Sequence, residues 1–215
     1  MKILCLIIDS DAPWTQTYAE HRKIWNAVLD RNPAVEGYFL RSDPSLTEEY
    51  RVEPRRFVVR GPERYDTILS KTLKAVEVLL TDHDYVLRTN LSSLYDFPLL
   101  QQMDLPKINL YAGSIHEAIG VTYVSGSGML LSSDVAQKLV VPTDLTVNEW
   151  DDIAIGQILR SRHIGPFRID RYNYDYGRSE DQITPGQYIQ YRLREGDPRE
   201  REREVVAKVF ARVYA

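Results

Sequence analysis

The sequence has one cysteine and four histidines. Cys5 lies in an apolar run, so no disulfide can form within the chain, and a reducing compartment is favoured. The histidines do not cluster with cysteine at the spacing of a metal site, and we interpret His116 and His163 as structural or surface residues. A disulfide scaffold and a structural zinc centre are therefore not expected.

Long hydrophobic runs and an excess of basic residues are also absent. The run from Ile3 to Ile8 is too short for a membrane span or a signal-peptide core, and Asp9 ends it. The sequence has 27 basic and 31 acidic residues, a net charge of −4, which argues against nucleic-acid binding as the default. We expect a cytoplasmic protein without a membrane span, unless the sequence comes from a longer, anchored protein.

Three common motifs for nucleotide binding or hydrolysis are missing. There is no G-x-x-x-x-G-K loop, no G-x-G-x-x-G after the first strand, and no G-x-S-x-G elbow. The sequence therefore does not support a P-loop enzyme, a dinucleotide-binding enzyme or an α/β hydrolase.

Strands and helices alternate along the chain. Short apolar or β-branched runs predict strands at Ile3–Ile8, Val35–Leu40, Arg56–Arg60, Tyr85–Leu87, Lys107–Tyr111 and 165–170. Helical spacing predicts helices at 13–32, 65–80 and 133–139, another beginning at Asp151, and a C-terminal helix over about 198–215 with a solvated start. We predict a single α/β domain over 1–215, with a mostly parallel sheet flanked by helices, which could be the N-terminal module of a longer protein.

A polar cluster follows the strand at Tyr85–Leu87. The preceding helix packs through one apolar stripe, and Lys71 is expected to lie off that stripe. The strand is followed at once by polar residues, among them Arg88, Thr89, Asn90 and Ser92. Ligands of open α/β sheets bind outside the carboxyl ends of the strands, so this cluster predicts a binding site.

Two further segments carry candidate functional residues. Gly126 and Gly128 flank Ser127 in a predicted turn, where glycines permit positive φ or the close approach of a ligand. Asp151 and Asp152 occupy the first turn of a predicted helix. Carboxylates there either complement the helix dipole or serve in acid-base chemistry, and the spacing alone does not choose.

These segments, in this order, resemble the GT-A sugar-nucleotide transferases, most closely the β-1,3-galactosyltransferase and fringe-like group, over roughly residues 60 to 170. Residues 83–92 resemble the family's Y-D-Y-x-x-K-T-D-D-D strand end, and residues 125–132 resemble its S-G-x-G-Y-x-L-S segment. Residues 151–156 are similar to its E-D-V-x-x-G helix start. The R-T-N-L-S-S strand end also resembles glycosyltransferase sequences of large DNA viruses of algae and amoebae.

The resemblance implies an inverting transfer of a sugar from a UDP-sugar to a hydroxyl of a glycan or glycoprotein. If the protein is viral, the resemblance implies that it acts in the cytoplasm of the host cell, in the synthesis of capsid glycans. Asp152 would be the catalytic base, with Asp151 as the alternative. Gly126, Ser127 and Gly128 would border the acceptor or the sugar. The residues implied in donor binding are Ser10, Asp11, Trp14, Arg22, Lys71, Arg88, Thr89, Asn90 and Ser92.

The chain departs from the family where the metal would bind. The family's aspartates hold Mn²⁺ or Mg²⁺ there, whereas this chain supplies neutral groups at 90–92, which bind such ions weakly. Two hypotheses stay open: a metal held mostly by the diphosphate with help from Asn90, Ser92, Ser93 or Asp96, or neutralisation by the basic side chains at 71 and 88. The D-x-D pattern at 82–84 precedes the strand, so it is expected at the opposite edge.

Two other functions compete with sugar transfer. A nucleotidyltransferase would need a carboxylate pair at a strand end and a glycine-rich loop after the first strand, and neither is seen. A degenerate nucleotide- or carbohydrate-binding module would keep the fold without turnover. Tyr172, Tyr174 and Tyr176 could form an acceptor surface, although packing explains them equally well.

Overall fold

A mixed eight-stranded sheet forms the centre of the protein. The computed structural model describes residues 1–10, 15–144, 146–148, 150–174, 182–194 and 201–214. The strand order is β3 (Tyr50–Glu53), β4 (Arg56–Arg60), β2 (Val35–Asp43), β1 (Ile3–Ile8), β5 (Tyr85–Asn90), β8 (Val121–Ser132), β7 (Tyr111–Ala118) and β9 (Phe167–Arg168). Pairs β4–β2, β2–β1, β1–β5 and β7–β9 are parallel, and β3–β4, β5–β8 and β8–β7 are antiparallel. The predicted α/β fold is confirmed.

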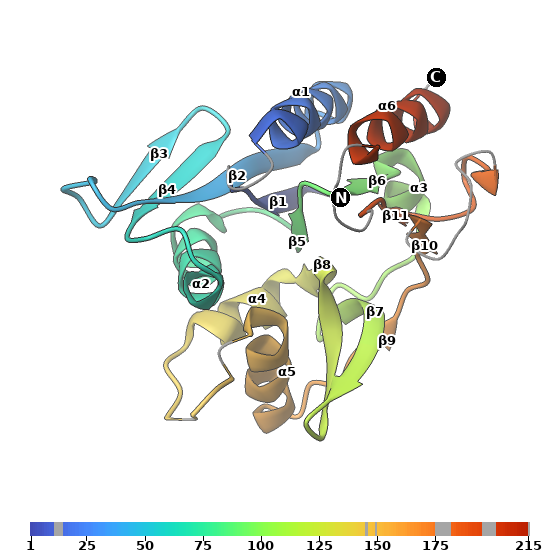
Figure 1. Cartoon of the computed structure of the whole chain (residues 1–215). Helices are drawn as coiled ribbons and strands as arrows, with labels where there is room; N and C mark the ends of the chain where they lie inside the picture. Colours follow the sequence, from blue (N-terminus) through green and yellow to red (C-terminus); the bar gives the residue numbers. More distant parts are fainter. Residues whose placement is uncertain (11–14, 145, 149, 175–181, 195–200, 215) are drawn as a thin grey trace.

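Helices cover both faces of this sheet (Figure 1). One face carries α1 (Thr15–Arg31), α3 (Phe97–Gln102), α6 (Glu202–Val213) and a small sheet of β10 (Tyr172–Asn173), β11 (Gln190–Arg192) and β6 (Ser93–Tyr95). The other face carries α2 (Ile68–Leu79), preceded by the short 3₁₀ turn Tyr65–Thr67, then α4 (Ser133–Val140) and α5 (Asp151–Ser161). Among the described helices, none is both long and apolar enough to cross a bilayer.

The alternation of side chains along β1 divides the core into two layers. Ile3, Cys5 and Ile7 pack toward α1 and α6, whereas Leu4 and Leu6 pack toward α2, α4 and α5. All five are fully buried, as expected for a central strand with helices on both faces. The continuous apolar run therefore places β1 at the centre and its carboxyl end at one edge of the sheet.

The prediction of a strand over Lys107–Tyr111 was wrong for most of that range. Only Tyr111 of that run is in a strand, and β7 continues from it into a hairpin with β8. The turn places Ile119 at φ 46° and Gly120 at φ 72°, the left-handed geometry of a tight hairpin turn. Isoleucine is rarely found there, so the residue pattern gave no hairpin signal.

Other boundaries also differ from the predictions. Tyr65 is 83% exposed in the 3₁₀ turn rather than packed on a helix. The strand predicted to stop at Leu87 runs to Asn90, and the predicted turn at 125–128 lies inside β8. Tyr172 and Tyr174 are buried, so they form no acceptor surface, while Tyr176 lies outside the described residues.

The C-terminal helix is described from Glu202, and the first part of its predicted range lies outside the described residues. Glu202 is fully buried, whereas Arg203 and Glu204 in the same turn are exposed. The carboxylate of Glu202 lies 3.8 Å from Nδ1 of His21 on α1, which is also fully buried. This contact joins the two helices of that layer.

Candidate active site

A buried carboxylate lies at the carboxyl end of β1. Asp9 follows the strand directly, and the parallel pairing of Ile8 with Asn90 sets it beside the end of β5. Its side chain is 1% exposed and accepts hydrogen bonds from Nε of Arg22 at 3.0 and 2.9 Å. Nε of Arg41, from β2, lies 3.6 Å away.

From the sequence, Asp9 was interpreted only as the end of a strand. Its position directly after a buried parallel strand was the signal that it faces the ligand-binding edge. Arg22 was expected to contact the donor, which stays a prediction; in the structure its guanidinium donates to Asp9 and, at 3.3 Å, to the backbone carbonyl of Ser10. Asp11 and Trp14 lie outside the described residues.

Lys71 is buried near Asp9, contrary to the prediction that it lies off the packed stripe of its helix. Its side chain is 1% exposed, and its ammonium group forms an ion pair with Glu63. Burial lowers the pKa of Lys71, whereas the charges of Glu63 and Asp9 oppose that effect and Arg88 adds to it. Lys71 therefore belongs to one cluster of charges with Asp9 and Arg88.

An ion pair connects β5 to the start of α5. The guanidinium of Arg88, 4% exposed, pairs with the carboxylate of Asp151. Burial raises the pKa of Asp151, and the charge of Arg88 opposes that shift. Arg88, which was expected to bind the donor, and Asp151, which was expected as the alternative catalytic base, therefore contact each other.

Asp152 makes different contacts from its neighbour. One oxygen accepts from the backbone N–H of Gly126 at 3.1 Å, and the other accepts from the N–H of Ile153 at 3.0 Å. The side chain is half-buried, and none of its described hydrogen bonds or ion pairs involves a cationic side chain. Of the two carboxylates, Asp152 is therefore the one that is not engaged by Arg88.

The glycines of β8 make room for protein side chains. A Cβ at Gly126 would lie 2.3 Å from Nη1 of Arg88, and one at Gly128 would lie 1.9 Å from the hydroxyl of Tyr95. Neither glycine has positive φ. Of the two possibilities, positive φ is therefore not the one used at these glycines, and the close approach in the structure is that of the guanidinium and the phenol.

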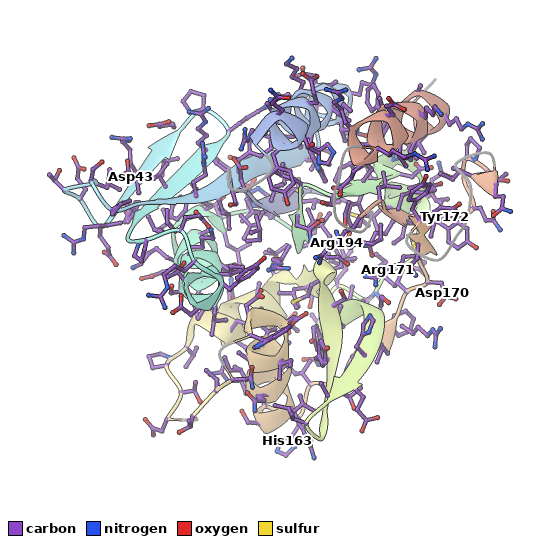
Figure 2. The ribbon with its side chains drawn as sticks, in the orientation of Figure 1. Asp43, His163, Asp170, Arg171, Tyr172 and Arg194 are labelled. Atoms are coloured by element: carbon purple, nitrogen blue, oxygen red, sulfur yellow. The ribbon has the colours of Figure 1, made fainter. Side chains whose placement is uncertain are left out.

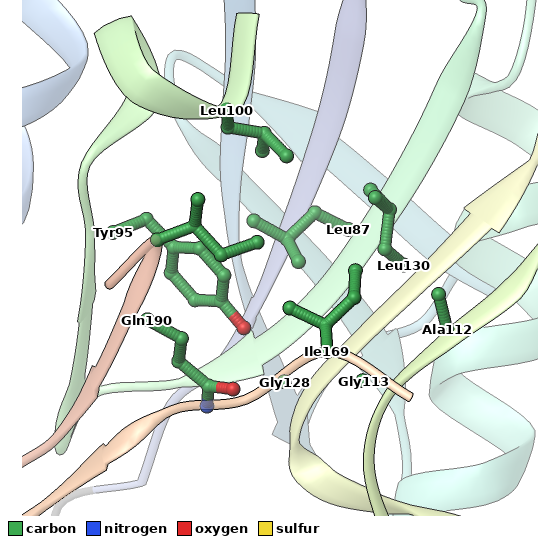
Figure 3. Close-up of a pocket in the computed structure, with 10 residues that line it drawn as sticks. Leu87, Tyr95, Leu100, Ala112, Gly113, Gly128, Leu130, Ile169 and Gln190 are labelled. Atoms are coloured by element: carbon green, nitrogen blue, oxygen red, sulfur yellow. The ribbon is translucent and has the colours of Figure 1, made fainter. Parts of the chain in front are cut away.

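Ser127 joins the main sheet to the small one. Its carbonyl accepts from the hydroxyl of Thr89 and from Nε2 of Gln190, both at 2.9 Å, and its hydroxyl bonds to Arg171. Tyr95 and Gln190 reach toward Gly128 (Figure 3), beside a cavity of about 10 Å³. Ser127 and Thr89 are buried, so in this arrangement both polar groups serve the packing of the sheet.

The residues considered for a divalent metal do not fit one. Oδ1 of Asn90 accepts from Nη1 of Arg192 at 3.0 Å, which places a cation where the metal would sit. Ser92 is buried, Ser93 donates to Asn90 at 3.3 Å, and Asp96 caps α3 by accepting from the N–H of Leu99 at 2.9 Å. In the described part of the chain, no three His, Cys, Asp or Glu side chains are grouped to hold a metal.

Two sets of residues excluded from the predicted site lie as expected. The D-x-D pattern at 82–84 precedes β5, and Asp82 pairs there with Lys2 at the amino edge. His163 is exposed just beyond the end of α5 that is remote from Asp151, as Figure 2 shows.

Arg171, which contacts the hydroxyl of Ser127, lies on the segment between β9 and β10 (Figure 2).

Comparison with known proteins supports the fold but gives no family. No protein family and no curated protein matches the sequence. Among solved structures, the chain is similar to the galactosyltransferase LgtC in complex with donor and acceptor sugar analogs. The identity is 17%, the TM-score is 0.53, and the match covers 96% of this chain and 95% of the other.

The fold is that of a GT-A glycosyltransferase, with a central sheet of mixed direction and helices on both of its faces. The more specific resemblance to the fringe-like and viral sequences stays a prediction.

Proposed function

We propose that the protein is a glycosyltransferase that moves a sugar from a UDP-sugar to a hydroxyl of a glycan or glycoprotein. The observation that carries this proposal is the charge cluster at the carboxyl ends of β1 and β5, in which Asp9, Lys71 and Arg88 are buried and Arg88 pairs with Asp151. Burying ionised groups is costly, and replacing them with apolar residues is often neutral or stabilising. Charges retained at the ligand-binding edge of an α/β sheet therefore indicate a binding role.

In this proposal the donor lies along the ends of β1 and β5. Ser10, Asp11 and Trp14 follow β1 and would contact the nucleoside, while Arg22 anchors that segment through Asp9. Lys71 and Arg88 would neutralise the diphosphate. Cationic side chains suit this task because their hydrogen bonds to phosphate oxygens are charge-assisted.

The neutralising charge is proposed to come from these side chains rather than from a metal held by the residues after β5. This proposal rests on the contacts of the residues that follow β5. The amide oxygen of Asn90 already contacts the guanidinium of Arg192, and the carboxylate of Asp96 caps a helix. Neither group is free to complete an octahedral set of oxygen ligands around Mg²⁺ or Mn²⁺.

The transfer is proposed to invert the anomeric carbon. The acceptor oxygen forms a bond to that carbon, and the bond from the carbon to the diphosphate oxygen breaks, leaving its electron pair on UDP. The proton of the acceptor hydroxyl passes to the carboxylate of Asp152. Asp151 is less suited to this step because its carboxylate is already paired with the guanidinium of Arg88.

The alternative, a binding module without turnover, is separated from an enzyme by one assay. The purified protein is incubated with a panel of UDP-sugars, and released UDP is measured with and without saccharide and glycoprotein acceptors. We expect slow hydrolysis of at least one donor in the absence of acceptor, since water can replace the acceptor hydroxyl. Binding of UDP without release of UDP from any donor would favour the module.

Lys71→Met is expected to weaken UDP binding by about 1 to 3 kcal/mol, the range of charge-assisted hydrogen bonds. The free energy of unfolding should change little at neutral pH, because methionine removes the cost of burying an ammonium and Glu63 remains partly exposed. Calorimetric titration of UDP and urea denaturation measure the two effects. Equal UDP affinity in the variant and the wild type would show that Lys71 does not contact the diphosphate.

The pH dependence of stability gives an independent check on Lys71. Because burial lowers its pKa below the ordinary 10.5, the folded state binds fewer protons than the unfolded state between the two values. Lys71 therefore makes the wild type gain stability as the pH rises through that window, a contribution that the Lys71→Met variant lacks. Urea denaturation of both proteins at neutral and alkaline pH compares the slopes.

A further inference from the structure

An exposed tryptophan precedes the two carboxylates of α5. Trp150 is 66% exposed, whereas Trp25 is fully buried in the core. Tryptophan is highly buried on average, because its large ring contributes strongly when it is removed from water. The packing of the described residues therefore does not account for a tryptophan at this position.

The backbone of Trp150 is fixed at the start of the helix. Its N–H donates to Oδ1 of Asn148 at 2.8 Å, and its carbonyl accepts from the N–H of Ala154 at 2.9 Å. The next two residues are Asp151, the partner of Arg88, and Asp152, the proposed base. An exposed indole is thus attached to the same rigid turn as the catalytic carboxylate.

Further aromatic rings lie near Asp152 on the β7–β8 hairpin. Tyr123 packs against α5, since a Cβ at Gly156 would lie 2.7 Å from its Cβ, and its ring centroid is 6.0 Å from that of His116. The charge of Asp152 contributes to the pKa of both rings: it adds to the rise that burial causes for Tyr123, and it opposes the fall that burial causes for His116. Asp152 therefore has ring-bearing side chains near it from two elements.

We infer that Trp150 is a stacking platform for the acceptor, and that the acceptor is a carbohydrate whose ring carries a C–H face. This inference rests on the proposed function and deepens it. A pyranose ring presents C–H groups on a face and hydroxyls at its rim, so it pairs an apolar surface with polar edges. The indole supplies the rigid apolar surface, while Tyr123, His116 and Asp152 supply polar groups at the rim.

The platform makes the choice of acceptor depend on ring shape. An open-chain polyol has the same hydroxyls but no flat C–H face, so it cannot stack in the same way. A serine or threonine side chain of a protein acceptor likewise offers no ring. Trp150 is therefore expected to favour an acceptor sugar over an isolated amino-acid hydroxyl.

The test follows sugar binding at the indole itself. Indole N–H resonances of labelled protein are recorded with UDP during titration of methyl β-galactopyranoside, methyl β-glucopyranoside and, as the open-chain control, sorbitol. Trp150→Ala identifies the Trp150 resonance. We expect a pyranoside, and not sorbitol, to shift that resonance.

Variants then measure the size of the effect. Pyranoside affinity, followed on backbone resonances of the β7–β8 hairpin, should fall about tenfold in Trp150→Ala, as expected for the loss of one stacked aromatic contact. The fall in pyranoside affinity should be smaller in Trp150→Phe. The matched control is Phe167→Ala, which removes a 53% exposed ring from the edge strand β9 and should bind like the wild type. UDP affinity should be the same in all four proteins.

Failure of this inference is distinguishable from failure of the proposed function. If UDP binds but no pyranoside shifts the Trp150 resonance, or if both Trp150 variants bind pyranosides like the wild type, the platform is wrong and the donor site stands. If UDP does not bind the wild type, the proposed function itself fails. Circular dichroism confirms that each variant is folded.

Discussion

Asp152→Asn is expected to lower turnover by about two to four orders of magnitude while leaving UDP affinity near that of the wild type. The amide cannot accept the proton of the acceptor hydroxyl. It can still accept a backbone hydrogen bond through its remaining oxygen, as the carboxylate does now from Gly126 and Ile153. UDP release under saturating donor measures turnover, and calorimetry measures UDP affinity.

The control for Asp152→Asn is the same change at the neighbouring residue. Asp151→Asn removes the charge that pairs with Arg88, so its main effect should be on stability and on the placement of the guanidinium. Turnover unchanged in Asp152→Asn would remove Asp152 from the role of base. A larger loss of turnover in Asp151→Asn, at equal stability, would transfer that role to Asp151.

Arg88→Met is expected to lower the free energy of unfolding by about 3 to 5 kcal/mol, because it leaves the carboxylate of Asp151, whose side chain is only 13% exposed, without its cation. The loss should shrink as the pH falls. Burial already raises the pKa of Asp151, and removing Arg88 raises it further, so protonation at lower pH relieves the uncompensated charge. Urea denaturation at neutral and acidic pH tests both statements.

The double variant Arg88→Met, Asp151→Leu separates stability from function. Replacing both partners with apolar residues should restore much of the stability lost in the single variant. UDP affinity should stay low, because the cation proposed to face the diphosphate is gone. Recovery of both stability and UDP affinity would show that Arg88 serves only the fold, and a single variant as stable as the wild type would contradict the ion pair.

The parts of the fold that were predicted correctly are those in which the local pattern and the tertiary environment agree. The apolar run of β1 needs helices on both faces, and it has them. The carboxylates at 151 and 152 begin α5 as their position indicated. The β7–β8 hairpin was missed because its turn forces Ile119 into a conformation that its side chain disfavours.

The candidate site depended on contacts between distant residues. Lys71 is charged and was expected off the packed stripe of its helix, but its pairing with Glu63 and its proximity to Asp9 are compatible with burial. The contact between Arg88 and Asp151 spans 63 residues in sequence. The need for glycine at 126 follows from the guanidinium beside it, which helical or strand periodicity does not reveal.

The most direct test of a sugar-nucleotide site is calorimetric titration of UDP, GDP and CMP into the purified protein, each with Mn²⁺ and then with a chelator. The family resemblance predicts selective binding of UDP. The charge cluster at the ends of β1 and β5 predicts that this binding persists in chelator, because Lys71 and Arg88 rather than a metal neutralise the diphosphate. Binding of UDP only in the presence of Mn²⁺ would contradict the proposal that these side chains neutralise the diphosphate without a metal. No binding of any nucleotide in either condition would contradict the proposed function.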